Sequence, residues 1–170
     1  MEYSHCPKCG HLLESRILKP IEPARLVCSS CGFVFFLDPK VAACTVFTLD
    51  RKVVLLQRGI EPSYGKWVFP GGYVDRGETV PEAAIRETRE EVNLEVRLDS
   101  LLGVYSYRHS PVIIVVYAAE IIGGLLRAAD EALDARPFST EEIPWNELAF
   151  PSTYEALRDY AKKYLSSRNE

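Results

Sequence analysis

Three glutamates and an arginine stand close together near the middle of the 170-residue chain, within residues 86–91. Positions three and four apart share one face of a helix, so Glu87, Glu90 and Glu91 would converge, with Arg86 one turn from Glu90. Clustered carboxylates repel one another unless a positive charge lies among them. Hard divalent cations take oxygen ligands, and Mg²⁺ usually bridges carboxylates to substrate phosphates. The pattern therefore predicts a magnesium-dependent phosphate site.

The surrounding residues predict a helix over about 80–92 that is entered from a glycine-rich loop. Thr79 and Glu82 have the spacing of a capping box, and Asn93 can end the helix in the left-handed conformation. The glycines of residues 70–72 mark a loop where the backbone approaches another group closely. A loop that leads into a helix N-terminus presents free N–H groups, which suit a phosphate. A solvated acidic helix held by ion pairs is the alternative, but it leaves the glycines unexplained.

Four of the five cysteines form two pairs with the spacing of metal ligands. Cys6 and Cys9 make one C-x-x-C motif, and Cys28 and Cys31 make a second after eighteen residues. Two such motifs at this separation predict a tetrahedral structural Zn²⁺ site within residues 1–36. Redox dithiols and disulfides are the alternatives, and disulfides are disfavoured in a reducing cytosol. Four cysteine ligands would leave no open position for zinc catalysis.

Composition indicates one globular domain with a real core and a small appendage, since 47% of residues are hydrophobic and 26% are charged. We place the two parts at residues 1–36 and 37–170. The net charge of −4 and the pI of about 5.5 argue against a non-specific nucleic-acid binder, which would be basic. No apolar run reaches the length of a membrane span, and the first residues lack signal-peptide features. We therefore expect a cytoplasmic protein.

Hydrophobic patterning predicts alternating strands and helices in the larger part. The expected strands cover residues 41–49, 53–57, 67–69, 94–97, 101–108, 112–117 and 136–138, with an acidic loop over 128–135. The run 112–117 is apolar on both faces and is expected at the centre of the sheet. Ser152 and Glu155 predict a second capping box, opening a C-terminal helix that reaches about Tyr164. Interleaved strands and helices predict an α/β fold with a mixed sheet between helices.

The run from Gly72 to Leu94 resembles the Nudix box, G-x5-E-x7-R-E-U-x-E-E-x-G-U, in which U is a bulky aliphatic residue. The matching residues are Gly72, Glu78, Arg86, Glu87, Glu90, Glu91 and Leu94. Two positions depart from the pattern: Thr88 replaces an aliphatic residue but keeps a β-branched shape, and Asn93 replaces glycine but can still cap the helix. The resemblance implies a Nudix α/β/α sandwich that hydrolyses the pyrophosphate bond of a nucleoside diphosphate derivative with Mg²⁺ or Mn²⁺.

The same resemblance implies roles for the glutamates and their neighbours. Glu87 and Glu91 are the expected metal ligands, with Glu90 sharing the cluster and the carbonyl of Gly71 as a further ligand. Arg86 would act in catalysis by orienting the glutamates through ion pairs.

Other roles in the site stay open. Glu78 would brace the loop against the helix or help to bind metal. The general base is either Glu87 or Glu90 within the box, or Glu131 in an acidic stretch further along the chain. A solvated loop acid is the alternative interpretation of Glu131.

Several residues around the box are expected to contact the small-molecule nucleotide substrate. These are Gly72 and Glu78 in the loop, with Trp67 and Tyr73 as aromatic rings that could stack on a base. Core packing is the alternative for each ring.

A zinc ribbon ahead of a Nudix box is a feature of two groups of pyrophosphatases. The NADH group carries a marker resembling S-Q-P-W-P-F-P, which this sequence lacks. Residues 60–67, 131–136 and 148–150 instead resemble the FAD and ADP-ribose group, so ADP-ribose or FAD is expected first. The alternatives are NADH or a nucleotide sugar as substrate, a non-catalytic nucleotide sensor, and an RNA-related protein. The resemblance also makes a homodimer possible.

Overall fold

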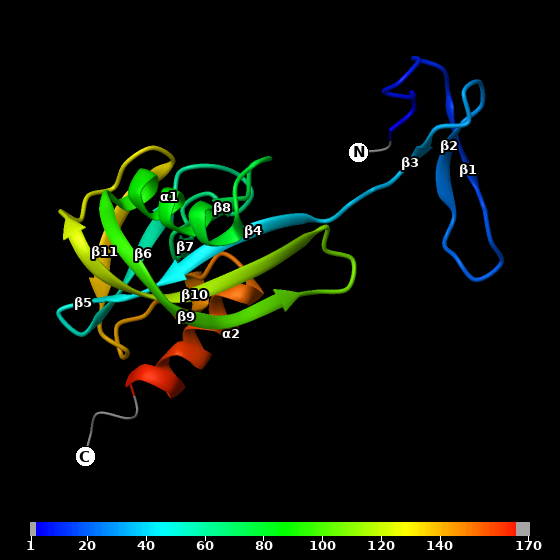
Figure 1. Ribbon diagram of the computed structural model, residues 1–170. Coiled ribbons are helices and arrows are strands. Elements are labelled where there is room, and N and C mark those ends of the chain that lie inside the picture. Colours follow the sequence, from blue (N-terminus) through cyan, green and yellow to red (C-terminus); the bar gives the residue numbers. More distant parts are fainter. Residues whose placement is uncertain (1–2, 166–170) are drawn as a thin grey trace. The chain divides into compact units, whose positions relative to one another are not determined.

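The structure, a computed structural model, describes residues 3–165 and divides into two compact units between Asp38 and Pro39 (Figure 1). The N-terminal unit is small and contains one three-stranded sheet. The C-terminal unit contains two sheets and the longer helices. Each unit is described by itself.

The small unit is an antiparallel sheet with little apolar interior. Its strands are β1 (Leu13–Arg16), β2 (Arg25–Cys28) and β3 (Val34–Phe35), in the order β1-β2-β3. Large apolar side chains such as Ile17 and Ile21 are exposed. A chain segment this short cannot bury enough apolar surface to fold on a hydrophobic core alone.

The four cysteines of this unit form one cluster, as their spacing predicts. All four sulfur atoms lie within 4.8 Å of one another, and Cys9 Sγ lies 3.4 Å from both Cys28 Sγ and Cys31 Sγ. Sulfurs bound to one Zn²⁺ at about 2.3 Å would lie about 3.8 Å apart, the separation of Cys6 Sγ and Cys31 Sγ. The backbone N–H of Cys31 donates to Cys28 Sγ and lowers the pKa of the Cys28 thiol to about 6. The cluster therefore fits a tetrahedral zinc site.

The larger unit contains a mixed sheet and a second, antiparallel sheet. The first has the order β8 (Gly71–Tyr73), β4 (Lys40–Val46), β10 (Val112–Gly124) and β9 (Leu94–Ser106). The second has the order β11 (Ala132–Phe138), β6 (Lys52–Arg58) and β5 (Thr48–Leu49), and β7 (Trp67–Val68) also pairs with β6. β10 runs parallel to β4 and antiparallel to β9, and it lies inside the sheet as its apolar run predicts.

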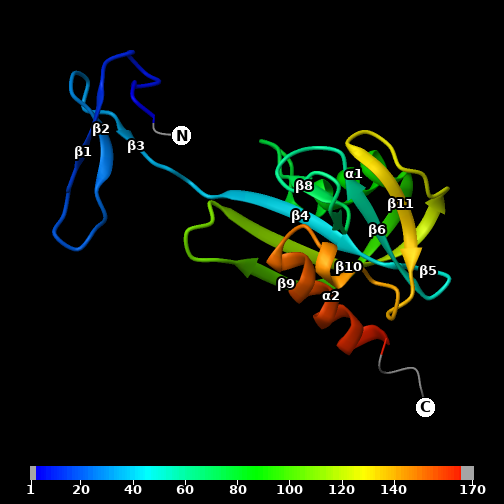
Figure 2. The ribbon, with the colours of Figure 1, turned by 180° about the vertical axis from the view of Figure 1, so that it is seen from behind.

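Helices lie on both sides of the mixed sheet, which confirms the predicted α/β/α sandwich. Helix α1 (Val80–Val92) packs on β4, β8 and β9, and α2 (Pro151–Tyr160) packs on β9 and β10 (Figures 1 and 2). A 3₁₀ turn over Trp145–Glu147 precedes α2, and a π-helical segment over Ala161–Leu165 follows it. Within residues 3–165 no helix combines the length and the apolar run that a membrane span needs.

Small and polar residues set how closely α1 approaches the sheet. Ala83 and Ala84 are fully buried against β4 and allow a close approach. Thr88 is also fully buried, and its hydroxyl lies 2.6 Å from that of Thr45 on β4 and donates to the carbonyl of Ala84 at 2.7 Å. These bonds satisfy the buried hydroxyl, and they explain how threonine occupies a position where the family pattern has an aliphatic residue.

The predicted N-terminal capping box of α1 and its left-handed C-terminal residue are both confirmed. Glu82 N–H donates to Thr79 Oγ1 at 3.4 Å, and Thr79 N–H donates to Glu82 Oε2 at 2.8 Å, which completes the capping box. Asn93 ends the helix in the left-handed conformation with φ of 56°. The helix occupies residues 80–92, as expected, because both ends are encoded by local hydrogen bonds.

Several predicted elements differ from the structure. The single strand expected over 41–49 is divided into β4 and β5, which belong to different sheets. The strands expected over 94–97 and 101–108 are one strand, β9. Bulges shift its pairing register against β10, so its hydrophobic pattern does not follow one regular alternation. The loop expected over 128–135 is shorter, because residues from Ala132 onward pair with β6 and form the start of β11. The second capping box is wrong: α2 begins at Pro151, and Phe150 caps it without a side-chain bond, while Ser152 is buried.

Loss of one zinc ligand should unfold the small unit selectively. We expect Cys28→Ser to lower the zinc content below one ion per chain and to remove the protection of β1 to β3 from hydrogen exchange, because metal binding supplies the folding energy of such units. Ser30→Ala, an exposed neighbour in the same motif, is the matched control. Full protection of these strands in metal-stripped protein would contradict a structural zinc site.

Candidate active site

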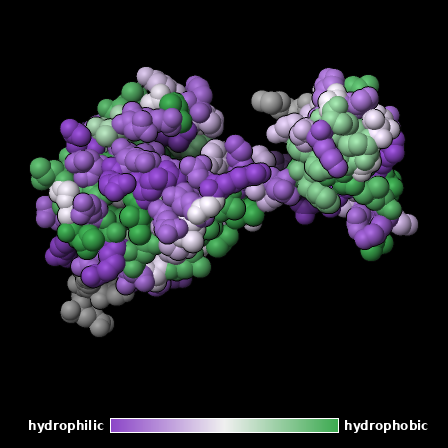
Figure 3. All heavy atoms as spheres, turned by 45° about the horizontal axis from the view of Figure 1, so that its top comes forward, coloured by the Kyte–Doolittle hydropathy of each residue, from purple (hydrophilic) through white to green (hydrophobic). Residues whose placement is uncertain are grey.

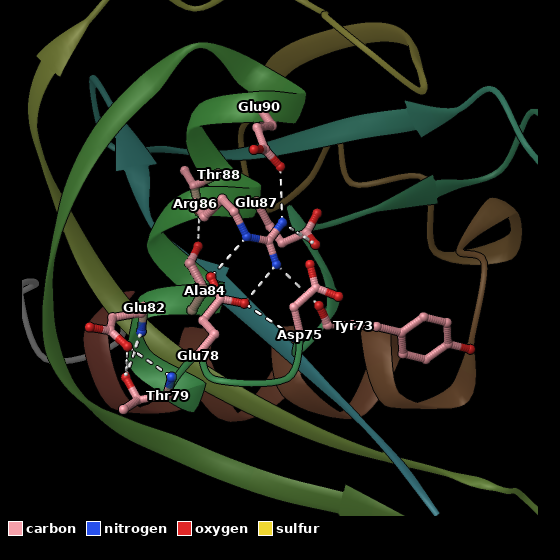
Figure 4. Close-up of polar contacts among 10 residues, drawn as sticks. All are labelled: Tyr73, Asp75, Glu78, Thr79, Glu82, Ala84, Arg86, Glu87, Thr88 and Glu90. Carbon is pink, nitrogen blue, oxygen red and sulfur yellow. Dashed lines mark hydrogen bonds and ion pairs between the residues drawn. The ribbon is translucent and has the colours of Figure 1, made fainter.

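Strand β8 and helix α1 position the acidic cluster. Figure 4 shows Glu78, Glu87 and Glu90 directed toward the guanidinium of Arg86, with β8 passing beside them. Figure 3 shows a broad hydrophilic area on the larger unit, as a charged site open to solvent would produce. The cluster predicted from helical spacing therefore forms in the folded protein.

The guanidinium of Arg86 is the hub of this cluster. Its Nε and Nη2 donate to the two oxygens of Glu78 at 2.8 and 2.9 Å, in a bidentate pair. Its Nη1 donates to Glu87 Oε1 at 2.8 Å and to Glu90 Oε2 at 2.9 Å, and Nη2 also donates to the carbonyl of Tyr73 at 3.1 Å. The bond from Arg86 lowers the pKa of Glu78 below its usual range. Three carboxylates thus share one cation.

Glu91 is different, because it is buried and has no ion-pair partner among the residues that the structure describes. Its Oε2 accepts a bond from the backbone N–H of Gly71 at 2.8 Å. Burial raises the pKa of Glu91 to about 8. The bond from Gly71 and the positive charge of Arg58 lower this pKa, whereas the negative charges of Glu87 and Glu131 raise it further. Burial likewise raises the pKa of Glu87. The site therefore holds more negative charge than its own residues compensate.

Two glycines allow the backbone of β8 to touch the carboxylates. A Cβ atom on Gly72 would lie 2.4 Å from Glu87 Oε1, and one on Gly71 would lie 2.4 Å from the sulfur of Cys44. Both separations are far inside van der Waals contact. Cys44 is buried, as expected, and lies directly behind the site, where burial raises the pKa of its thiol.

The donor set suits a hard divalent cation. Glu87, Glu90 and Glu91 offer carboxylate oxygens from one stretch of α1, and the N–H of Gly71 bonds to Glu91. Among the described residues only the four cysteines already hold their ligand atoms within 4.8 Å of one another, so a cation here would have to draw the glutamate carboxylates together. Oxygen ligands with excess negative charge are what Mg²⁺ and Mn²⁺ prefer. A cation placed among them would offset the cost of the buried Glu91 carboxylate.

A second group of residues lies near the backbone of Glu91, whose carbonyl accepts a bond from the N–H of Ala129 at 3.0 Å. The guanidinium of Arg58 stacks 5.1 Å over the ring of Phe150, and its Nε donates to the carbonyl of Pro62 at 2.9 Å. The backbone N–H of Gly59 donates to the carbonyl of Glu131 at 2.6 Å, which ties the expected base to the end of β6. From the sequence, Arg58 could contact a phosphate but is more often a surface residue, and no local pattern marks its stacking on the distant Phe150.

The two aromatic residues expected to bind substrate have different environments. Trp67 is 3% exposed and packs edge-on against Phe138 at 4.9 Å, with Arg136 over its ring, so its faces are occupied and unavailable to a base. The expectation for Trp67 is therefore corrected to core packing. Tyr73 is 49% exposed and lies at the edge of the site, with Lys40 Nζ 4.5 Å from its ring centre.

The raised pKa of Glu91 predicts how pH acts on the metal-free protein. In the unfolded chain the pKa would be about 4.3, below the folded value of about 8. Protonated Glu91 therefore contributes fully to the free energy of unfolding below about pH 4, and this contribution is lost as pH rises through about 8. Glu91→Gln lacks this titration, so we expect its free energy of unfolding, relative to wild type, to rise between about pH 5 and pH 9 in EDTA.

Urea unfolding at both pH values measures this difference, and Glu95→Gln, at an exposed glutamate on β9, is the control. If the free energies of unfolding of wild type and Glu91→Gln differed by the same amount at both pH values, the raised pKa of Glu91 would be contradicted.

The chain is similar to proteins of one family over nearly its whole length. Residues 38–160 match the family model described as NUDIX domain, and residues 4–36 match the model described as Nudix N-terminal. An ADP-ribose pyrophosphatase from Methanocaldococcus jannaschii is 39% identical over 134 residues, which cover 75% of this chain and 76% of that protein.

Two further comparisons include the N-terminal unit. The NAD-capped RNA hydrolase NudC from Stutzerimonas stutzeri is 24% identical over 169 residues, 98% of this chain but 58% of that protein. The crystal structure of a NUDIX hydrolase from Nitrosomonas europaea has a TM-score of 0.90 and 31% identity, covering 96% of this chain and 93% of that one. With the box residues gathered around Arg86, these matches show that the chain belongs to the Nudix hydrolase family, with a zinc ribbon ahead of the catalytic domain.

Proposed function

We propose that the protein hydrolyses the pyrophosphate bond of ADP-ribose with Mg²⁺ and releases AMP, with FAD as the next substrate. The observation that carries this proposal is the carboxylate cluster, in which Arg86 serves three glutamates and leaves buried Glu91 uncompensated. The similarity to the pyrophosphatase from M. jannaschii supports ADP-ribose as the first substrate.

In this proposal Glu87, Glu90, Glu91 and the carbonyl of Gly71 hold the cation. When bound, it supplies positive charge that stabilises the negative charge developing on the phosphate oxygens. The protein's task is then positioning and charge stabilisation, because transfer of a phosphoryl group needs little covalent chemistry from the enzyme. Manganese fits the same oxygen donors.

Arg86 and Glu78 would hold the cluster in its working geometry. The bidentate pair ties the loop before α1 to the helix, and the remaining donors of Arg86 fix the carboxylates of Glu87 and Glu90. Because Arg86 is engaged by these partners, we assign it a positioning role. The glycine backbone of β8 beside Glu87 would admit the diphosphate close to the metal ligands.

We assign the general base to Glu131 rather than to Glu87 or Glu90. The two box glutamates are both bonded to Arg86, which occupies one carboxylate oxygen of each. Glu131 is exposed and has no ion-pair partner within the described part of the chain, and its segment lies against Glu91, whose carbonyl accepts from the N–H of Ala129 at 3.0 Å. A carboxylate with these properties can take a proton from water beside the metal ligands.

Arg58 and Phe150 would hold the nucleoside end of the substrate. The ring offers a stacking surface, and the guanidinium offers donors to a phosphate. NADH and nucleotide sugars are the alternative substrates, and similarity to NudC extends the alternatives to a nucleotide-capped RNA end. A non-catalytic sensor is the alternative from another class, and the complete set of box glutamates argues against it.

A hydrolysis panel tests the proposed reaction. Purified protein with Mg²⁺ is offered ADP-ribose, FAD, NADH, a nucleotide sugar and a nucleoside triphosphate, and products are separated by chromatography. We expect AMP from ADP-ribose at the highest kcat/KM and from FAD next. Tight binding of one compound without turnover of any would instead make the protein a sensor.

Substitution of two glutamates separates the metal site from the base. We expect Glu91→Gln to lower turnover by about two orders of magnitude or more and to raise the Mg²⁺ concentration for half-maximal rate, because a ligand charge is lost. Glu131→Gln should lower kcat by about 10² or more without changing that Mg²⁺ requirement. Glu95→Gln should match wild type. Wild-type turnover by Glu131→Gln would return the base to Glu87 or Glu90.

A further inference from the structure

Lys40 and Tyr73 form an exposed pair beside the active site; Tyr73 was expected to contact substrate, and the proposed function above gives neither residue a role. Lys40 Nζ lies 4.5 Å from the centre of the Tyr73 ring. Tyr73 is 49% exposed, and Lys40 has no carboxylate partner within residues 3–165. The pairing of Ala42 with Tyr73 in the sheet brings Lys40 and Tyr73 to the same edge. The pair thus presents an aromatic surface and a free ammonium group to solvent.

The order of contacts along β8 places this pair relative to the acidic cluster. Gly71 donates to Glu91, Gly72 touches Glu87, and the carbonyl of Tyr73 accepts from Arg86. A strand rises about 3.3 Å per residue, so Tyr73 lies about 7 Å beyond Gly71. Figure 4 shows the ring of Tyr73 extending away from Arg86, while its backbone stays beside the cluster.

The second cation and ring pair adjoins the segment that leads into the other end of β8. The N–H of Arg58 donates to the carbonyl of Lys66, the N–H of Ala149 donates to the carbonyl of Trp67, and Arg58 stacks on Phe150. The carboxylates proposed to bind metal therefore have one cation–aromatic pair at Tyr73 and another beside the residues that precede Gly71. This arrangement matches a molecule with a diphosphate in its middle and a cyclic group at each end.

The chemistry of Lys40 and Tyr73 suits a sugar. An aromatic face packs against the C–H groups of a sugar ring, and an ammonium group donates up to three hydrogen bonds to hydroxyls. A nucleoside triphosphate has no cyclic group beyond its phosphates and could not use this pair. We propose that Lys40 and Tyr73 bind the terminal sugar of a nucleoside diphosphate sugar and so select this class over nucleoside triphosphates. The inference rests on the proposed pyrophosphatase activity.

Binding without metal tests the subsite separately from catalysis. Dissociation constants for ADP-ribose and for AMP, which lacks the terminal sugar, are measured by calorimetry in EDTA. The variants are Lys40→Met, which keeps the apolar stem, Tyr73→Ala, and Tyr73→Phe, which keeps the ring. Lys52→Met is the matched control, since Lys52 is an exposed lysine paired with Glu142. Thermal unfolding confirms that each variant is folded.

We expect Lys40→Met and Tyr73→Ala each to weaken ADP-ribose binding about tenfold and to leave AMP binding within about twofold of wild type. Tyr73→Phe and Lys52→Met should bind ADP-ribose as wild type does. With Mg²⁺, the first two variants should raise KM for ADP-ribose more than they lower kcat.

Two results would overturn the subsite: unchanged ADP-ribose binding in both Lys40→Met and Tyr73→Ala, or equal weakening of ADP-ribose and AMP. If wild type cleaves ADP-ribose, such a result removes this inference alone. If wild type neither binds nor cleaves any nucleoside diphosphate sugar, the proposed function falls as well.

Discussion

The arrangement of the site depends on a single guanidinium. Arg86 has five N–H donors in a rigid planar fork, and it uses them on Glu78, Glu87, Glu90 and the carbonyl of Tyr73. These partners come from the loop, the helix and β8, so one side chain sets the relative position of three segments. A lysine has a compact charge without this fork and could not bind them all in the same geometry.

The same interaction leaves an imbalance that the proposed metal would correct. Arg86 compensates Glu78, Glu87 and Glu90, whereas Glu91 is buried, has no ion-pair partner among the described residues and has a raised pKa. Ala83 and Ala84 bring α1 close to β4, and the glycines of β8 remove the side chains that would separate helix from strand. Close packing thus creates a carboxylate that is costly to ionise without a cation, which is a local departure from stability of the kind found at functional sites.

The N-terminal unit has too small an apolar interior to fold on packing alone. Its sheet buries few apolar side chains and leaves several exposed, so packing alone cannot offset the loss of chain entropy. The four clustered thiols can supply the missing free energy through bonds to zinc. Soft sulfur donors in one unit and hard oxygen donors in the other would keep the two kinds of metal ion in their separate sites.

Local patterns in the sequence were enough to predict α1, its caps, the glutamates on its face and the cysteine cluster. Each depends on residues a few positions apart, or on the ligand spacing of one metal. The tertiary structure decided what depends on distant neighbours: Trp67 packs against Phe138 of β11, Arg58 stacks on Phe150, and Lys40 lies over Tyr73. It also joined β9 into one strand and started α2 without a side-chain cap. Burial and electrostatic fields arise from packing between segments, and local spacing carries no record of which segments will meet.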